Sequence, residues 1–477
     1  MRYIFFFSTL LVFAVSGVSQ DTKSIVIQSV EKKAGEYKEI ALNIWEEAEL
    51  GFREEKSISL LIQPLKEAGF RIETGVAGMP TSFIAEWGDG GSVIGFLAEY
   101  DALPAMSQAA VPYLQAAEEG RPGHACGHHL FGTASMAAAI AVKQWLEETG
   151  TPGRIRLYGT PAEEGGGGKV FMVREGLFDD VDAVITWHPG DMNKSAPNST
   201  LSAISATFSF SGVASHAARF PERGHSALDG VEAMNNMVNL LREHIPQESR
   251  IHYTIKNGGG AANVVPAKAS VGYIIRHPDM KTVKDLLRRV NLAAEGAAMG
   301  TETQVEMTIE TGYYNILPNT ILSRIVQQNL EEIGGVPYDD AELQFALKLS
   351  ETFPQKVDPR RAAEVEPFDE NPPVTSASTD VGDISWVVPT TSFRAATWVP
   401  GTASHSWQAV AAGGMSIGIK GMLVAAKTQA ASALDLFQDP GIILSAKKEL
   451  LLKRGEPFQY EALLGDIPPP LDYRKDY

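Results

Sequence analysis

The sequence has very little cysteine: Cys126 is the only one among 477 residues. A chain with one cysteine cannot form an internal disulfide, which excludes a small disulfide-held scaffold. A free thiol is also a liability in an oxidising compartment unless something occupies it. The surroundings of Cys126 are therefore the first place to search for function.

Long apolar runs are missing beyond the N-terminus. No later segment has about 18 uninterrupted apolar residues, the length that a membrane-spanning helix needs. The start combines the basic Met1-Arg2, an apolar run over 4–15 and the small residues of Gly17-Val18-Ser19. This pattern predicts a cleavable signal peptide over 1–19 and a secreted, periplasmic protein with no membrane association after cleavage. An uncleaved anchor is the alternative.

The chain has fewer basic than acidic residues. The chain has 41 Lys and Arg against 58 Asp and Glu, a formal net charge of −17. An acidic chain repels phosphate backbones, so nucleic acid is not an expected partner. No internal repeat occurs at a fixed period, and the length is sufficient for two domains.

The first part of the chain alternates strand and helix patterns. Apolar residues recur at helical spacing between 20 and about 68, and an Ala-rich segment at 129–146 predicts another helix. Compact apolar runs predict strands at 92–98, 154–159 and 182–187. The alternation indicates an α/β fold, with a mainly parallel twisted sheet flanked by helices.

The pattern changes near residue 200. Strands at 201–211, 251–256, 268–276 and 302–310 and helices at 227–245 and 282–299 follow the order of a split βαβ, ferredoxin-like α+β unit. We therefore expect a domain at 201–312 inserted into a discontinuous catalytic domain, 20–200 and 313–477. Residues 335–375 are rich in Glu, Asp and Pro and are predicted to be a surface excursion. The tail after Pro468 is predicted to be irregular.

Four short segments concentrate potential metal ligands. Imidazole and thiolate are standard donors for zinc and similar ions. Three of the segments lie at or near the ends of predicted parallel strands or at a helix start, where ligands bind in open α/β sheets. The segments are Gly123–His129, Pro161–Gly165, Trp187–Pro189 and Gly401–Trp407. We predict that they bring together the metal ligands Cys126, His128, Glu164, His188 and His405.

Five donors suit a pair of ions. Two divalent ions about 3.5–4 Å apart can polarise a carbonyl and hold a shared hydroxide. A thiolate such as that of Cys126 can bridge them. Glu163, next to Glu164, suits the role of general base. Asp101, at the end of a strand, is predicted to accept a ring N–H from a ligand histidine. The ligand types do not choose between zinc and manganese.

Other motifs are weaker. Gly165–Gly168 with Lys169 looks like a phosphate loop, but Val170 stands where Ser or Thr is needed. Gly414–Gly418 has the G-x-S-x-G form, but that hydrolase needs a later histidine, and none follows His405. The zinc deaminase signature is absent. A non-catalytic metal-binding protein is the alternative from another class, although such a carrier does not need a base beside its ligands.

Several segments together carry a resemblance to a known family. Ala98–Pro104, Gly123–His128, Pro161–Gly165 and Thr186–Pro189 resemble motifs of the aminoacylase/carboxypeptidase-like dinuclear metallopeptidases, within their cysteine-containing amidohydrolase branch. Further matching segments are Phe171–Gly176, Ser378–Asp383 and His405–Gln408. The similarity covers nearly the whole mature chain.

The resemblance implies a reaction and further residues. It implies two divalent ions per subunit, with Cys126 as the bridge, and a lid domain that makes a homodimer. His216 matches a lid histidine that helps to hold the oxyanion, often across the dimer. Asn263 and Arg276 match substrate-binding positions, and Arg276 is suited to clamp a carboxylate. His129 replaces the Asp or Asn of many relatives and is a candidate either for changing the support of the ligands or for a sixth donor.

The small-molecule substrate implied by the resemblance is an amide. The bond joins an acyl or aminoacyl group to an amino acid. An exported dipeptidase or aminoacylase of different specificity is the alternative within the same chemistry.

Overall fold

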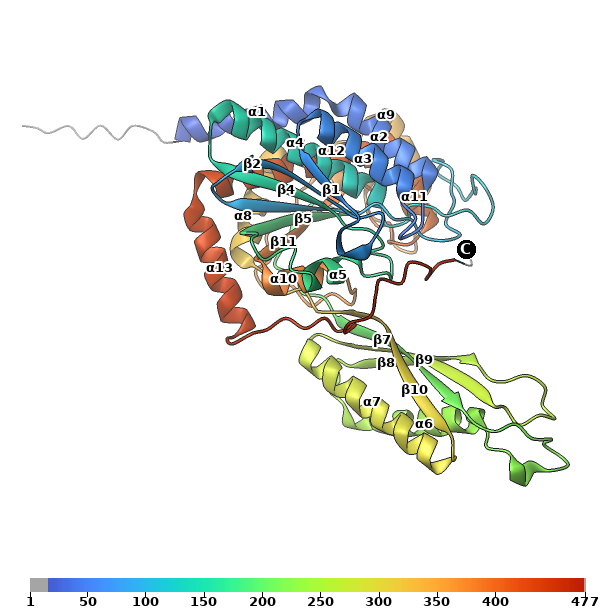
Figure 1. Ribbon diagram of the computed structural model, residues 1–477. Helices are drawn as coiled ribbons and strands as arrows, with labels where there is room; N and C mark the ends of the chain where they lie inside the picture. The colour runs from blue at the N-terminus through green and yellow to red at the C-terminus, as the bar shows by residue number, and fades with distance from the viewer. Residues whose placement is uncertain (1–15, 476–477) are drawn as a thin grey trace, which may run out of the picture.

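The computed structural model describes residues 16–475 and contains two sheets, each with its own hydrophobic core (Figure 1). Both ends of the chain build the larger unit, and the middle of the chain builds the smaller one. Of the predicted signal peptide, residues 1–15 lie outside the described residues. Residues 16–19 begin helix α1 (Ser16–Lys32).

The larger sheet has the strand order β1-β2-β4-β3-β5-β11-β6. Its centre is parallel: β4, β3, β5 and β11 run in one direction, and β1, β2 and β6 pair antiparallel at the edges. The mainly parallel α/β architecture expected from the sequence is confirmed. The strands are β1 (Arg71–Thr74), β2 (Phe83–Asp89), β3 (Val93–Ala98), β4 (Gly153–Gly159), β5 (Ala183–Gly190), β6 (Lys194–Ser195) and β11 (Thr390–Ala396).

Helices cover both faces of this sheet (Figure 1). On one face lie α4 (His128–Thr149) and α12 (Ser416–Gln438), with α1 and α2 (Ala34–Glu47) packed over them and α3 (Glu55–Glu67) beside α4. On the other face α5 (Gly168–Arg174) packs against α10 (Val381–Val387). Helix α8 (Thr320–Ile333) packs against β11 and β6, and α13 (Pro440–Arg454) contacts α8 and α12.

Small residues let α4 approach the sheet closely. A Cβ placed at Gly132 would lie 2.7 Å from the carbonyl oxygen of Glu99, just beyond the end of β3. The close contact explains why this helix is rich in Ala and has a glycine in its interior, where glycine costs backbone entropy. It also brings the first turn of α4 next to the carboxyl ends of the strands.

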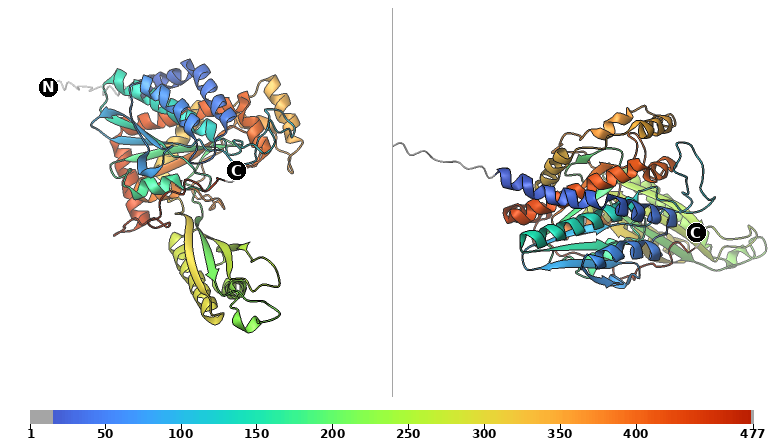
Figure 2. Two further views of the ribbon diagram at one scale, coloured as in Figure 1. Left: turned by 45° about the vertical axis from the view of Figure 1, so that its right-hand side comes forward. Right: turned by 90° about the horizontal axis from the view of Figure 1, so that it is seen from above.

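The smaller unit is an antiparallel sheet of order β10-β7-β9-β8 with two helices on one face. It projects from the larger unit (Figure 2). Its elements are β7 (Ser202–Ser211), α6 (Ala227–Leu241), β8 (Arg250–Asn257), β9 (Lys268–His277), α7 (Met280–Gly300) and β10 (Gln304–Tyr313). This order is the strand-helix-strand-strand-helix-strand order expected from the sequence. The domain boundaries and the lid and dimerisation roles stay predictions.

The prediction of a surface excursion over 335–375 is wrong for its first half. Helix α9 (Asp340–Ser350) begins at a capping box formed by Asp339 and Glu342. Its apolar residues pack in a third small core with α11 (Trp407–Gly413), where Phe345 and Leu349 are buried. The acidic residues therefore cap a helix, whereas their composition alone is typical of an exposed loop.

Among residues 16–475, no single helix has the length and apolarity to cross a membrane. One pair, Trp407–Gly413 with Ser416–Gln438, meets the criteria by length and composition only, with a bend of 74° between its members.

Candidate metal centre

The carboxyl ends of the four parallel strands meet at one edge of the larger sheet, next to the start of α4. His188 lies inside β5, because that strand runs to Gly190 and is longer than predicted. Cys126 and His128 flank Gly127, whose φ is +78°. A Cβ at Gly127 would lie 2.8 Å from Pro189 Cβ, so only glycine lets this turn pass the end of β5.

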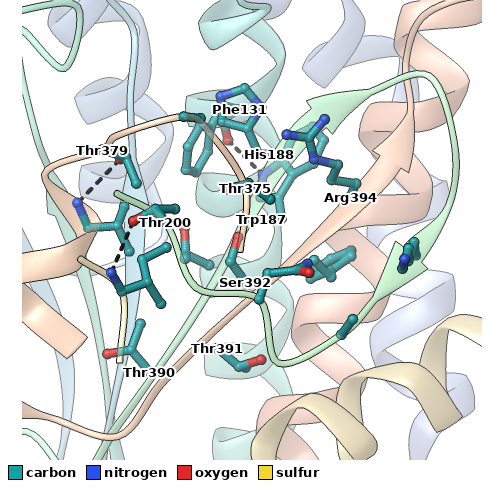
Figure 3. Close-up of a pocket in the computed structure, with 18 of the residues that line it drawn as sticks. Phe131, Trp187, His188, Thr200, Thr375, Thr379, Thr390, Thr391, Ser392 and Arg394 are labelled. Carbon is teal, nitrogen blue, oxygen red and sulfur yellow. Dashed lines mark hydrogen bonds between the residues drawn. The ribbon is translucent and has the colours of Figure 1, made fainter. Parts of the chain in front are cut away.

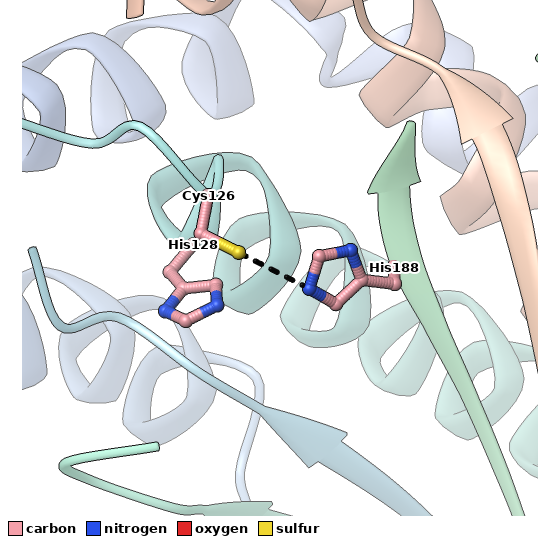
Figure 4. Close-up of side chains that lie close together, drawn as sticks. All are labelled: Cys126, His128 and His188. Carbon is pink, nitrogen blue, oxygen red and sulfur yellow. Dashed lines mark hydrogen bonds between the residues drawn. The ribbon is translucent and has the colours of Figure 1, made fainter. Parts of the chain in front are cut away.

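The five predicted ligands come together in two groups that share Cys126. Cys126, His128 and His188 form one group, and Cys126, Glu164 and His405 form the other; in each, the potential ligand atoms lie within 4.8 Å of one another. Cys126 Sγ is 3.4 Å from His188 Nε2 (Figure 4). His405 Nε2 is 3.2 Å from Glu164 Oε1. Cys126 thus occupies the junction between two possible ion positions.

The surroundings of His128 fit a metal ligand. Its Nδ1 lies 2.8 Å from Asp101 Oδ1, which assigns the ring proton to Nδ1. Nε2 is buried and makes no hydrogen bond among residues 16–475, and its near neighbour is Glu99 Oε2 at 3.0 Å. A buried imidazole nitrogen without a partner is costly, and a divalent ion would satisfy it.

The loop before Glu164 is held from three distant parts of the chain. Ala162 has a φ of +56°, an unusual conformation for a residue with a side chain. Its N–H donates to Glu54 at 2.9 Å, and the N–H of Glu164 donates to Asp101 Oδ2 at 2.9 Å. Arg474, in the C-terminal tail, donates to the carbonyl oxygen of Glu164. Burial raises the pKa of Glu54 to about 8.

The tail and Glu54 were not identified as site residues from the sequence. The tail is irregular as predicted, but it runs between the two units (Figure 1), and its Arg474 reaches the loop that carries Glu164. Tyr473 adds a hydrogen bond of 3.3 Å to the same carbonyl of Glu164. No sequence signal marks such a contact, because it depends on where the chain end is directed.

Glu163 lies among other carboxylates. Burial and the negative charges of Glu99, Glu164 and Asp380 raise its pKa well above the usual range, and Lys169 opposes this. The raised pKa makes this carboxylate a stronger proton acceptor than an ordinary glutamate. The position next to Glu164 predicted from the sequence therefore has the electrostatic surroundings of an acid–base residue.

A buried ion cluster supports this region. The Nζ of Lys169 lies 2.7 Å from Asp380 Oδ1 and 2.8 Å from Glu99 Oε1, and all three side chains are buried. Glu99 Oε2 lies 3.0 Å from His128 Nε2, and Glu99, His128 and Glu163 form a third group of possible ligands. Glu99 was missed, although it stands directly after β3 and two residues before Asp101.

The candidate ligand side chains have shifted pKa values with distinct causes. Burial, followed by the charge of Glu164, raises the pKa of the Cys126 thiol. Burial, followed by the charge of Arg394, lowers the pKa of His188 well below its usual range. A hydrogen bond with Glu164 raises the pKa of His405. Since only a thiolate is a ligand, metal binding would release the Cys126 proton.

Two hollows adjoin these residues. A cavity of about 270 Å³ extends from Cys126 and His188 along β11 toward its first residue, Thr390, and is lined by many Thr and Ser side chains (Figure 3). A larger cleft of about 1100 Å³ lies between the two units. Glu163 and His405 line both, so the candidate metal centre connects the cleft to the inner cavity.

The remaining predicted site residues divide into two sets. Arg276, on β9, lines the cleft together with Glu163 and His405. His216 and Asn263 lie together in exposed loops of the smaller unit, where the N–H of Ala217 donates to the Asn263 carbonyl at 3.0 Å. Neither lines the cavity or the cleft at the metal centre. A single chain therefore does not bring them to the ligands.

His129 does not face the candidate ions. Its Nε2 lies 3.1 Å from the carbonyl oxygen of Gly413, and its ring packs against His124. Among residues 16–475 it belongs to none of the candidate ligand groups. The possible sixth donor is thus Glu99 rather than His129.

Comparisons with known proteins agree with this site. The model of peptidase family M20/M25/M40 matches residues 95–406. A p-aminobenzoyl-glutamate hydrolase component of Escherichia coli is 42% identical over 90% of this chain and 95% of its own length. The motifs of this chain between residues 98 and 189, described above for the family, also resemble this Escherichia coli protein. Mouse Xaa-Arg dipeptidase is 31% identical, with 80% of each chain covered, and Campylobacter jejuni hippurate hydrolase is 30% identical over 57% of this chain and 72% of its own.

Solved structures share the fold. The aminobenzoyl-glutamate utilization protein of Klebsiella pneumoniae superposes with a TM-score of 0.60 at 18% identity, covering 86% of this chain and 97% of its own. A Bacillus subtilis protein, named a dinuclear metal binding peptidase from the M20 family, superposes with a TM-score of 0.58 at 18% identity, covering 86% and 99%.

Proposed function

The chain belongs to peptidase family M20/M25/M40 and is a hydrolase, and from this premise we propose that it cleaves the amide bond between an acyl or aminoacyl group and an amino acid with a free carboxylate. The observation that carries the proposal is the convergence of five metal donors beside the spare carboxyl group of Glu163. The names of its relatives point to p-aminobenzoyl-glutamate, dipeptides and hippurate, which all contain such a bond.

The two groups of donors define which residues would hold each ion. His128 and His188 would bind one ion, Glu164 and His405 the other, and Cys126 both. Bound there, two zinc or manganese ions supply Lewis acidity to the amide carbonyl and to the attacking water. The mixed thiolate, imidazole and carboxylate set suits either metal.

The chain's own residues supply proton transfer and positioning. Glu163 takes a proton from the water that attacks the carbonyl carbon, and returns it to the nitrogen of the leaving amino acid as the C–N bond breaks. Asp101 fixes the His128 ring through Nδ1 and the Glu164 backbone through its second oxygen. One carboxylate thus orients a ligand in each group.

His216 and Asn263 would act on the centre of a second copy of the chain. Their exposed position away from the ligands of their own chain supports a homodimer through the smaller unit. Mixing inactive Glu163→Gln and His216→Ala proteins tests this, because a mixed dimer would contain one intact site. Activity recovered on mixing supports the shared site, and its absence in a proven mixed dimer contradicts it.

We also propose export to the periplasm, supported by the basic start and the apolar run over 4–15. Mass spectrometry of the protein from the exporting cell tests it. A mature chain that begins at Gln20 supports the assignment, and a retained N-terminus contradicts it.

The reaction itself is tested with a panel of N-acyl amino acids and dipeptides and with Glu163→Gln. We expect this variant to keep both ions while kcat falls by about 100-fold or more, since positioned acid–base groups contribute about 10²–10⁴-fold. Glu119→Gln, an exposed loop change of the same kind, is the control. Normal turnover by Glu163→Gln would refute the base assignment. Metal binding by the wild-type protein without hydrolysis of any panel member would favour a metal carrier.

A further inference from the structure

Two positively charged side chains lie in register with the proposed metal ligand His188 on the next two strands of the larger sheet. In the parallel pairing of β5 and β11, His188 is opposite Arg394, and in the antiparallel pairing of β11 and β6, Arg394 is opposite Lys194. Register partners on neighbouring strands project from the same face of a sheet, and neighbouring strands lie about 4.8 Å apart. The backbones of Arg394 and Lys194 are thus about 5 and 10 Å from that of His188.

All three side chains line the inner cavity. Figure 3 shows Arg394 beside His188. The stem of Arg394 lies over Gly190, where an added Cβ would be 3.3 Å from Arg394 Cδ. The guanidinium is therefore held close to the metal centre.

Neither cation has an acidic partner within 4.0 Å among residues 16–475. Arg394 is exposed and Lys194 is half-buried, so both charges are accessible to a ligand in the cavity. Hydroxyl groups continue the lining: Thr186, opposite Ser392, is buried and its Oγ1 has no hydrogen-bond partner among the described residues. The cavity thus offers two unpaired positive charges and a free hydroxyl to whatever enters it.

We propose that Arg394 and Lys194 form a subsite for the side-chain carboxylate of an acidic amino acid in the substrate. This rests on the proposed function, because it names the class of amino acid that the cleaved amide joins. A carboxylate can accept two hydrogen bonds from one guanidinium and another from an ammonium group. An apolar side chain in the same place would desolvate two charges and leave them unpaired.

The position of Arg276 leaves this subsite free for the side chain. Arg276 lines the cleft on the other side of Glu163 and His405, where the sequence resemblance places recognition of a carboxylate. A substrate whose amide lies at the metal centre can then place its α-carboxylate toward Arg276. Its side chain then enters the inner cavity over the face of β11 and β6 that carries Arg394 and Lys194.

The test compares kcat/KM for N-benzoyl-glutamate and N-benzoyl-glutamine with the metal-loaded protein. The wild type should prefer glutamate. Arg394→Gln and Lys194→Gln should each reduce this preference, Arg394→Gln by about 10- to 100-fold, the size expected for lost hydrogen bonds to a charged group. Arg394→Lys keeps the positive charge but loses the two-pronged hydrogen bonding of the guanidinium, so its preference for glutamate should lie between those of the wild type and Arg394→Gln. Lys448→Gln, which removes one positive charge from the exposed side of α13, should leave the preference unchanged.

Each other outcome overturns the assignment. An equal loss of kcat/KM on both substrates would show that Arg394 holds the α-carboxylate, and an unchanged kcat/KM on both would show no role in recognition. A third outcome is that the wild type prefers N-succinyl-leucine, whose acyl group is acidic, and that Arg394→Gln abolishes this preference. That result would place the acyl part of the substrate in the cavity.

A binding measurement separates this inference from the proposed reaction. Free glutamate should raise the melting temperature of the wild type more than glutamine does, and Arg394→Gln, folded by circular dichroism, should lose that difference. If the wild type hydrolyses no substrate, the proposed function fails. The rise in melting temperature with glutamate then still tests whether the subsite binds an acidic side chain. Equal protection by glutamate and glutamine would refute it.

Discussion

Asp101→Asn should weaken the binding of metal without unfolding the protein. Asp101 is buried and touches both candidate ion positions through their ligands: Oδ1 lies 2.8 Å from His128 Nδ1, and Oδ2 accepts the Glu164 N–H at 2.9 Å. Burial alone would raise its pKa, but the neighbouring His128 lowers it, so the group is a carboxylate. Asparagine has only one acceptor oxygen and presents an NH₂ group to the second donor.

The magnitude follows from these two contacts. At least one hydrogen bond to a charged acceptor is lost, and such bonds contribute about 1.5–3 kcal/mol. Because about 1.4 kcal/mol corresponds to a tenfold change in an equilibrium constant, we expect metal affinity to fall by about 10- to 100-fold. Residues that orient metal ligands have effects of about this size.

The assay is competition with a chelator, read as stoichiometry and Kd for each ion. Asp383→Asn is the matched control, since Asp383 is also buried and also accepts two hydrogen bonds, from Tyr460 at 2.7 Å and from the Tyr314 N–H at 3.0 Å. It belongs to none of the candidate ligand groups of the described residues. If Asp101→Asn bound both ions as tightly as the wild type, or no more weakly than the control, the argument from ligand orientation would be wrong.

Two further predictions concern the tail and the pH dependence of stability. Arg474→Ala should speed metal loss to a chelator several-fold, because its guanidinium holds the carbonyl of Glu164; a rate equal to that of Lys448→Ala would count against this role. Burial raises the pKa of Asp383 from its usual value to about 7, so the folded chain binds this proton more tightly than the unfolded chain. The free energy of unfolding should therefore fall as pH rises from about 4 to about 7. In urea titrations, Asp383→Asn should show a smaller fall, and an equal fall would refute the assignment.

The candidate ligand positions were accessible to sequence reasoning for a local reason. Each of Cys126, Glu164 and His188 stands at or near the end of an element whose apolar pattern is clear, and parallel strands end at the same edge of a sheet. His405 was included by its residue type and its motif. The strand that brings its loop to the site, β11, was not predicted.

The supporting residues could not be identified in the same way. Lys169 attracted attention only as part of a rejected phosphate loop, and its pairing with Asp380 and Glu99 depends on contacts between α5, α10 and the end of β3. Arg474 lies in a segment without periodicity. Such residues have ordinary local sequence, and their function arises from a long-range contact.

By itself, the sequence determined the chemistry available and the local structure that presents it. The single cysteine, the clustered histidines and the adjacent glutamates specify donors and a base, and short-range hydrophobic periodicity specifies most strands and helices around them. Both are properties of residue type and of neighbours along the chain.

Only the tertiary structure decided which of these donor side chains lie together and which other residues lie beside them. Strand pairing across β5, β11 and β6 places Arg394 and Lys194 in register with His188, and helix packing places Glu99 against His128. Register and packing are set by the burial of a whole sheet face, which no local pattern encodes. The shared position of Cys126, between two groups of candidate ligands, is a result of that assembly.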